Sequence, residues 1–181
     1  MSEKLDLIII GSGPGGLTAG LLARQRSKSY LILEKGRHVM QGIIDTYPKG
    51  KKVYPTIPKS YKDPFPLKDV EPPPEKVPVE AYIEQAETVV SEKELNIRYN
   101  EEFVAIEGSF PDYVVRTQNH SYMTKHIVLA FGSNIPNELG IYGEAKTVAR
   151  NLENGEDYIG INVLVIGGGN AAADVVASLS R

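Results

Sequence analysis

An almost uninterrupted apolar run, LDLIII, covers Leu5–Ile10 near the start of the chain. Its β-branched residues and its lack of alternation are typical of a strand buried on both faces of a parallel sheet. The apolar positions then change to helical spacing over 14–27, where three leucines share one side. A second apolar run, YLIL, opens 30–36. The three segments together predict a β-α-β unit at the start of the chain.

The middle of the chain is dominated by proline. Nine of the twelve prolines lie in 48–78, and proline removes backbone donors and disfavours helix in the residue before it. We expect an irregular segment there, and both a surface loop and a loop that lines a site stay open. Helical spacing returns over 79–95, and four short runs then predict strands: 96–99, 103–108, 113–118 and 126–132.

The last apolar run, VLVIG, repeats the pattern of the first one and is followed by a helical stretch. The sequence therefore predicts an α/β protein with a Rossmann-like β-α-β domain, a small β meander, and the first strand and helix of a second Rossmann-like domain. We place the first domain at 1–140, a connection at 141–160 and the incomplete second domain at 161–181.

A glycine triplet follows the first predicted strand at the mouth of the first predicted helix. Gly11 permits a tight turn, Gly13 lets the backbone approach a pyrophosphate, and Gly16 lets helix and strand pack closely. The free N–H groups and the partial positive charge of the helix N-terminus favour phosphate binding. Because strand, turn and helix occur in the required order, the triplet predicts a nucleotide site.

Glu34 ends the second predicted strand and is placed to accept both hydroxyl groups of an adenosine ribose. A carboxylate there disfavours a 2′-phosphate, because the two negative groups would repel each other. The residues themselves leave NAD and FAD as alternatives for this site.

Composition and charge narrow the classes of function. The formal net charge is −3 with scattered charged residues, so no basic stripe predicts nucleic-acid binding. The chain has no cysteine, which excludes disulfides, thiolate metal sites and a redox dithiol within it. Three isolated histidines without a carboxylate cluster predict no metal site. No apolar run approaches the roughly 20 residues of a membrane span, so we expect a cytoplasmic protein that does not enter the membrane.

The stretch DLIIIGSGPGGLTAGLLARQRSKSYLILEKG resembles the FAD-binding start of the flavoprotein disulfide reductase superfamily. The segment IVLAFGSNIP is similar to the Ala-Thr-Gly segment of that superfamily, with a phenylalanine in place of the threonine. The resemblance implies FAD as the first cofactor, held by the glycine turn, the end of the second strand, the position that meets adenine and the Ala-x-Gly segment: Gly11, Ser12, Gly13, Pro14, Gly15, Gly16, Glu34, Lys35, Phe103, Ala130, Phe131 and Gly132.

The stretch VLVIGGGNAAAD resembles the second glycine motif of the superfamily, which holds NADPH or NADH. The residues that the resemblance assigns to this nucleotide are Gly167, Gly169, Asn170, Ala171 and Ala172. An alanine in the third motif position is common in the superfamily where NADPH is used. The spacing is most similar to the thioredoxin reductase-like branch, but the redox cysteine pair of that branch is absent from this chain.

The resemblance implies an FAD-dependent oxidoreductase that passes electrons from NAD(P)H through the flavin to an acceptor protein or small molecule. Two alternatives stay open: a non-catalytic nucleotide-binding module and a protein similar to flavin monooxygenases. We also expect the chain to be part of a longer protein, because one strand and one partial helix cannot bury both their apolar faces alone. A homodimer of the full-length form is left open.

Overall fold

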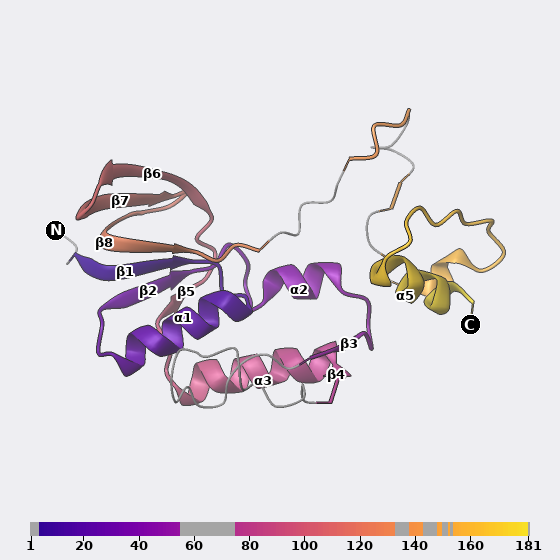
Figure 1. The fold of residues 1–181 in the computed structure, drawn as a ribbon, viewed down its shortest axis with the longest axis horizontal. Helices are drawn as coiled ribbons and strands as arrows, with labels where there is room; N and C mark the ends of the chain where they lie inside the picture. The colour runs from indigo at the N-terminus through magenta and orange to yellow at the C-terminus, as the bar shows by residue number, and fades with distance from the viewer. Residues whose placement is uncertain are drawn as a thin grey trace.

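The computed structural model describes residues 4–54, 75–132, 138–142, 148–149, 152 and 154–180. It begins with the predicted β-α-β unit and continues through a helix and a three-stranded meander (Figure 1). The helices and strands of this part are β1 (Leu5–Ile10), α1 (Pro14–Gln25), β2 (Tyr30–Leu33), α2 (Gln41–Thr46), β3 (Lys52–Val53), β4 (Val77–Pro78), α3 (Val79–Glu92), β5 (Ile97–Arg98), β6 (Phe103–Ser109), β7 (Asp112–Thr117) and β8 (Ser121–Leu129).

Six of these strands form one sheet in the order β5-β2-β1-β8-β7-β6. Strands β5, β2, β1 and β8 are parallel, and β8, β7 and β6 continue as antiparallel neighbours. Strand β1 is central in the parallel part, where Ile8 pairs with Leu31 on one side and with Ile127 on the other. The continuous apolar runs of the sequence are therefore the strands that have neighbours on both edges.

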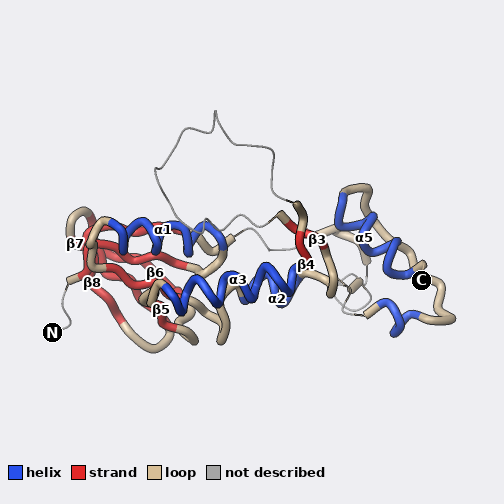
Figure 2. Tube along the Cα trace, turned by 90° about the horizontal axis from the view of Figure 1, so that it is seen from below, coloured by secondary structure: helices blue, strands red, loops and turns tan. Residues whose placement is uncertain are grey.

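Both faces of the parallel strands are covered, and the residues of β1 alternate between two cores. Ile9 packs with Leu17 of α1 and Tyr82 of α3 on one face of the sheet. Ile8 packs with Val115 and Tyr122 of the meander on the other face. Figure 2 shows α1 and α3 as the helices beside the sheet. The predicted α/β class with a small meander is confirmed.

Several elements differ from the predictions in extent. The helix predicted over 79–95 ends at Glu92, and the strand predicted from 126 begins at Ser121 because it also pairs with β7. The short helix α2 and the β3-β4 pair were not predicted. Most of the proline-rich stretch 48–78 lies outside the described residues, and so do parts of the predicted connection 141–160.

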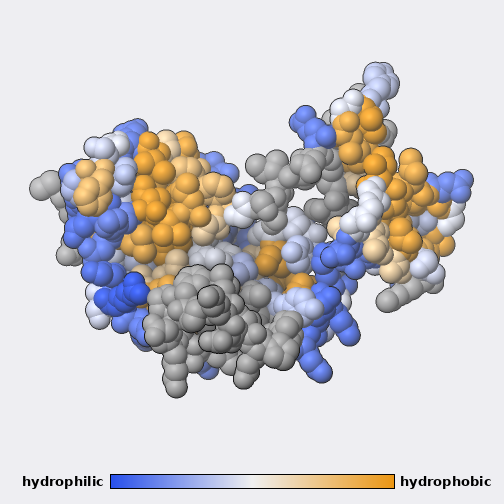
Figure 3. Space-filling model, viewed as in Figure 1, coloured by the Kyte–Doolittle hydropathy of each residue, from blue (hydrophilic) through white to orange (hydrophobic). Residues whose placement is uncertain are grey.

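The apolar run at the start of the second Rossmann-like unit forms no strand in this chain. Residues 162–168 are in no strand, and Leu164 is 83% exposed. No described strand pairs with these residues. An apolar sequence of this kind is therefore insufficient to form a strand without a neighbouring strand. The helix that follows, α5 (Asn170–Leu179), forms as predicted. Figure 3 shows the apolar surface of this C-terminal part, to which Ile159, Ile161 and Leu164 contribute.

Among the residues that the structure describes, no helix has the length and apolar composition needed to cross a bilayer.

Candidate nucleotide site

Three chain segments that are distant in sequence meet where the parallel strands β1, β2 and β8 end. The amide of Gly11 donates to the carbonyl of Leu33 at 2.8 Å, and the amide of Ala130 donates to the carbonyl of Ile10 at 2.8 Å. The glycine turn, the residues after β2 and the predicted Ala-x-Gly segment therefore lie at one edge of the sheet. The carboxyl edge of a parallel sheet is where such folds bind nucleotides.

Glycine is required at two positions of the first turn for different reasons. Gly11 has φ +101°, and a Cβ there would lie 2.5 Å from the carbonyl oxygen of Ala130. A Cβ on Gly16 would lie 1.9 Å from the carbonyl oxygen of Gly11. Both contacts are with backbone, which cannot rotate away. The first and third glycines therefore allow the close packing that the sequence predicted.

Gly13 differs, because a Cβ built on it would meet nothing within 4 Å. It caps α1 in an extended conformation without a side-chain hydrogen bond, and Pro14 occupies the first turn. The amides of the first turn of a helix have no intrahelical acceptor. An open space in front of these amides fits an anionic pyrophosphate.

Glu34 is buried with 6% of its surface exposed, and its carboxylate is bound to the glycine turn. The amide and the hydroxyl of Ser12 donate to Oε2 at 2.9 and 2.5 Å, and the amide of Gly36 donates to Oε1 at 2.8 Å. Oε1 has one donor among these contacts, and a carboxylate oxygen accepts two. The carboxylate is thus fixed in orientation, and Oε1 keeps the capacity to accept from one further donor, such as a ribose hydroxyl.

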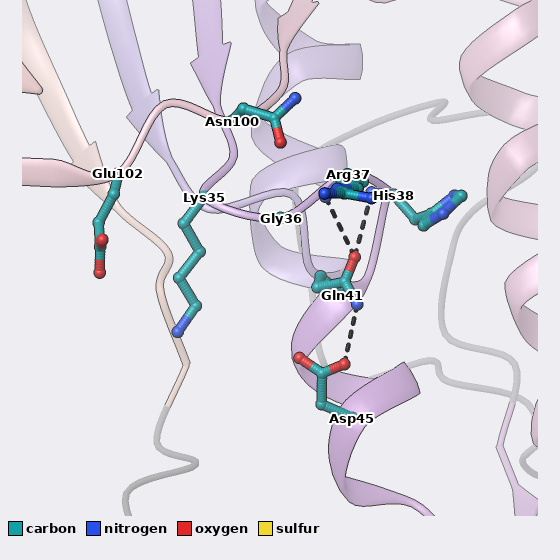
Figure 4. Close-up of a pocket in the computed structure, with 8 residues that line it drawn as sticks. All are labelled: Lys35, Gly36, Arg37, His38, Gln41, Asp45, Asn100 and Glu102. Carbon is teal, nitrogen blue, oxygen red and sulfur yellow. Dashed lines mark hydrogen bonds between the residues drawn. The ribbon is translucent and has the colours of Figure 1, made fainter. Parts of the chain in front are cut away.

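A pocket of about 510 Å³ opens after the end of β2, next to Lys35 and Gly36, which follow Glu34 in the chain (Figure 4). The side-chain amide oxygen of Gln41 accepts from the amides of Arg37 and His38 at 3.2 Å, and its Nε2 donates to Asp45 at 2.8 Å. These bonds fix the turn that leads into α2. The pocket is lined by Lys35, Gly36, Arg37, His38, Gln41, Asp45, Asn100 and Glu102.

The other predicted residues of the first site lie around this edge in different surroundings. Lys35 lines the pocket, whereas Phe103 begins β6 and packs against the core on the meander side. Phe131 follows β8 with 64% of its surface exposed, and Gly132 has φ +77°. The sequence did not predict the contributions of Asn100 and Glu102, because nothing in their own segment signals that it folds back beside β2.

The second glycine motif forms its own turn before α5. Gly167 has φ +136°, and Gly169 caps α5 in the extended conformation that Gly13 adopts before α1. A Cβ on Gly167 would lie 3.6 Å from the Cβ of Ala172. Asn170 and Ala171 form the first turn of the helix. The two motifs therefore share the same local form, although residues 162–168 are in no strand.

A buried carboxylate that the sequence analysis did not single out lies behind the pocket. Glu101 is 3% exposed and accepts hydrogen bonds from the hydroxyl of Thr117 and from His120 Nδ1, the latter at 2.5 Å. Burial opposes ionisation, but the hydrogen bonds of Thr117 and His120 outweigh it and lower the pKa of Glu101. His120 is one of the three histidines that are isolated in the sequence, and in the structure it is a partner of this carboxylate.

Comparison with known proteins shows where this architecture occurs. The sequence profile of a family described as pyridine nucleotide-disulphide oxidoreductase matches residues 8–181. A ferredoxin–NADP reductase of Pediococcus pentosaceus is 30% identical over 99% of this chain and 52% of its own length. The chain spans about half the length of the curated relatives it matches.

Solved structures share the fold over nearly the whole chain. A bacillithiol disulfide reductase from Staphylococcus aureus superposes with a TM-score of 0.83 and 23% identity, over 98% of this chain and 54% of that one. A flavin-containing monooxygenase from Stenotrophomonas maltophilia superposes with a TM-score of 0.76 and 17% identity, over 99% of this chain and 56% of that one. At these identities the two structures show a common fold alone.

Proposed function

Because the chain belongs to the pyridine nucleotide-disulphide oxidoreductase family, we propose that it provides the FAD site and the first NAD(P)H-binding turn of a flavin-dependent oxidoreductase. FAD and NAD(P)H are the cofactors that the family and its FAD- and NADP-bound neighbours support. The observation that carries the proposal is the convergence of the glycine turn, Glu34 and Ala130 at one edge of the sheet.

Different residues at this edge bind different parts of FAD. The amides in the first turn of α1 bind the pyrophosphate, and Gly13 leaves the space it needs. Glu34 accepts from the adenosine ribose through the oxygen that Gly36 only partly occupies. Lys35 and Arg37 supply positive charge at the pocket wall. FAD, when bound, supplies the hydride and electron chemistry, while the protein binds and orients it.

The second turn fits a nicotinamide nucleotide in the same way. Gly169 and the first turn of α5 present amides to a pyrophosphate, and Gly167, with φ +136°, makes the tight turn before them. The small third residue of the motif, Ala172, favours NADPH, because an alanine at this position is common in the superfamily where NADPH is used. NADH stays the alternative, because Gly167–Ala172 bind the pyrophosphate and do not contact the group that distinguishes the two nucleotides.

The acceptor is proposed from chemistry and from the relatives. No cysteine occurs in the chain, so no thiol relay can lie within these residues. We therefore favour an acceptor that takes electrons at the flavin itself, either an iron–sulfur protein, as for the ferredoxin–NADP reductase relative, or a small-molecule disulfide, as for the bacillithiol disulfide reductase. A non-catalytic nucleotide-binding module is the competing function.

Anaerobic reduction separates the enzyme from the binding module. Purified protein of full natural length should carry a flavin absorbance spectrum, and NADPH without oxygen should bleach it. A yellow protein that neither NADPH nor NADH bleaches would support the binding module. Protein that takes up no FAD after reconstitution would contradict both.

A further inference from the structure

The segment that follows β5 forms one wall of the pocket beside Glu34. The amide of Glu101 donates to the carbonyl of Glu34 at 2.9 Å, and the amide of Asn100 donates to the carbonyl of Gly36 at 3.0 Å. The amide of Glu34 in turn donates to the carbonyl of Arg98 at 2.9 Å. The main chain of Glu34 is therefore held in place by this segment, and Asn100 and Glu102 line the pocket itself.

The turn between β7 and β8 is hydrogen-bonded to the same segment, residues 100–102. Asn119 Nδ2 donates to the carbonyl of Asn100 at 2.9 Å. The amide of Gln118 donates to the carbonyl of Glu102 at 3.1 Å, and its Nε2 donates to the carboxylate of Glu102 at 2.6 Å. Between these contacts, the carboxylate of Glu101 accepts from Thr117 and His120. Three consecutive residues, 100–102, are thus tied to the β7-β8 hairpin.

We propose that Glu101 is a positioning residue for the adenosine half of FAD, which acts through the main chain of Glu34 and through the wall that Asn100 and Glu102 form. Glu101 does not line the pocket, so its effect on the cofactor is indirect. This inference rests on the proposed function, because it assumes that FAD occupies the site.

The chemistry of Glu101 favours this role over simple packing. A buried carboxylate is costly, and an apolar residue of similar volume often stabilises a fold as well or better. A charged acceptor, however, fixes two donors at once with directional bonds. Thr117 ends β7 and His120 lies in the turn that follows, so the bonds set the distance between the β7-β8 hairpin and the pocket wall.

A matched pair of charge-removing variants tests the proposal. Glu101→Gln removes the buried carboxylate, and Glu107→Gln makes the same change in the exposed ion pair with Arg116, at 2.6 Å on the same meander. FAD affinity of the full-length apoprotein is measured by quenching of flavin fluorescence, well below the melting temperature of each variant. We expect the Kd for FAD to rise about ten- to a hundred-fold in Glu101→Gln and to stay within about twofold in Glu107→Gln.

Thr117 provides a second test that leaves the carboxylate in place. Thr117→Val has nearly the same shape but lacks the hydroxyl, and we expect it to weaken FAD binding about tenfold. Thr117→Ser keeps the hydroxyl and should restore the affinity of the wild-type protein. Loss of packing alone predicts the opposite order, because serine removes a methyl group and valine does not. This pair also keeps the test decisive if Glu101→Gln fails to fold.

The outcomes for the two proposals are distinguishable. Wild-type protein that takes up no FAD would overturn the proposed function. Wild-type protein that binds FAD, together with Glu101→Gln or Thr117→Val variants that fold and bind it equally well, would overturn the positioning role alone. Equal weakening in the Glu101 and Glu107 variants would likewise show a general loss of stability instead of positioning.

Discussion

At the scale of single residues, Glu34 has two functions that the sequence could only half predict. Its place at the end of an apolar strand predicted a carboxylate at the ribose. The structure adds that the same carboxylate holds the glycine turn through the amide and hydroxyl of Ser12. Ser12 is fully buried. The glycine motif does not specify which residue stands at this position, so the motif alone does not predict the hydroxyl group. The contact depends on the close approach of two strand ends and not on local sequence.

Glu34→Ala is expected to weaken FAD binding by about 1.5–3 kcal/mol, the range for a lost hydrogen bond to a charged group. Glu34→Gln should have a smaller effect if its amide oxygen takes the place of Oε1. Titration of the apoprotein with FAD measures both. Retention of wild-type affinity in Glu34→Ala would contradict the assignment of Glu34 to the ribose.

Gly13 and Gly16 separate binding from folding within one turn. Gly13→Val places its side chain in open space, so the apoprotein should keep the melting temperature of the wild type while flavin binding is abolished. Gly16→Ala forces a Cβ against the carbonyl of Gly11, and we expect a loss of about 3 kcal/mol or more of folding stability. Thermal unfolding without cofactor and the flavin spectrum report the two effects independently. A yellow Gly13→Val protein would contradict the proposed pyrophosphate position.

At the scale of elements, the sequence predicted those whose signal is local. Strands β1 and β2 are continuous apolar runs, and α1 and α3 have clear helical spacing, so each was found near its predicted position. The extent of β8 was underestimated, because its first half is stabilised by pairing with β7. The apolar run VLVIG forms no strand, because a strand also needs a neighbour. The local pattern of apolar and polar residues does not determine which distant segments pair.

Asp6 ties β1 to two other parts of the sheet and gives the fold a defined response to acid. Lys125 of β8 donates to its carboxylate at 2.8 Å, and the amide and hydroxyl of Ser29, just before β2, donate at 3.1 and 3.0 Å. The hydrogen bond from Lys125 is the largest cause, and those from Ser29 follow; together they lower the pKa of Asp6 well below its usual range. The ionised form is therefore the one that stabilises the sheet.

A lowered pKa contributes stability above the pKa of the unfolded state and loses it as the pH falls toward the folded value. The wild-type protein should therefore lose stability between about pH 5 and pH 2 more steeply than Asp6→Asn. Ser29→Ala, which removes one of the donors, should give an intermediate slope. Urea unfolding at a series of pH values measures this dependence. Identical slopes for wild type and Asp6→Asn would show that the contacts of Asp6 make no net contribution.

At the scale of the whole molecule, the candidate site joins segments from three parts of the chain. The sequence predicted the glycine turn, Glu34 and the Ala-x-Gly segment, each from its own motif. It did not predict that Asn100 and Glu102 would line the pocket or that the β7-β8 hairpin would hold them, since both depend on the register of the meander. Sequence motifs therefore locate the groups that touch the cofactor. The groups that hold those residues in place can be identified only once the fold topology is known.

The C-terminal segment supplies the last prediction. Ile8, Ile9 and Ile10 of the first apolar run are buried between two neighbouring strands, whereas Val163, Leu164 and Ile166 of the last one are in no strand and are 42%, 83% and 54% exposed. In the 181-residue chain, amides of 163–166 should exchange with solvent at nearly the rate of an unstructured peptide. The hydrogen bonds of the β1 amides should open only with the global unfolding of the sheet, so these amides should exchange far more slowly.

Hydrogen exchange followed by mass spectrometry resolves these two peptides in a single experiment. An exposed apolar strand sequence also favours pairing with another edge, so protection of 163–166 should rise with protein concentration while that of β1 stays constant. A monomer confirmed by light scattering provides the reference. Strong protection of 163–166 in that monomer would mean that these residues pair within the chain, and the second glycine turn would then be preformed.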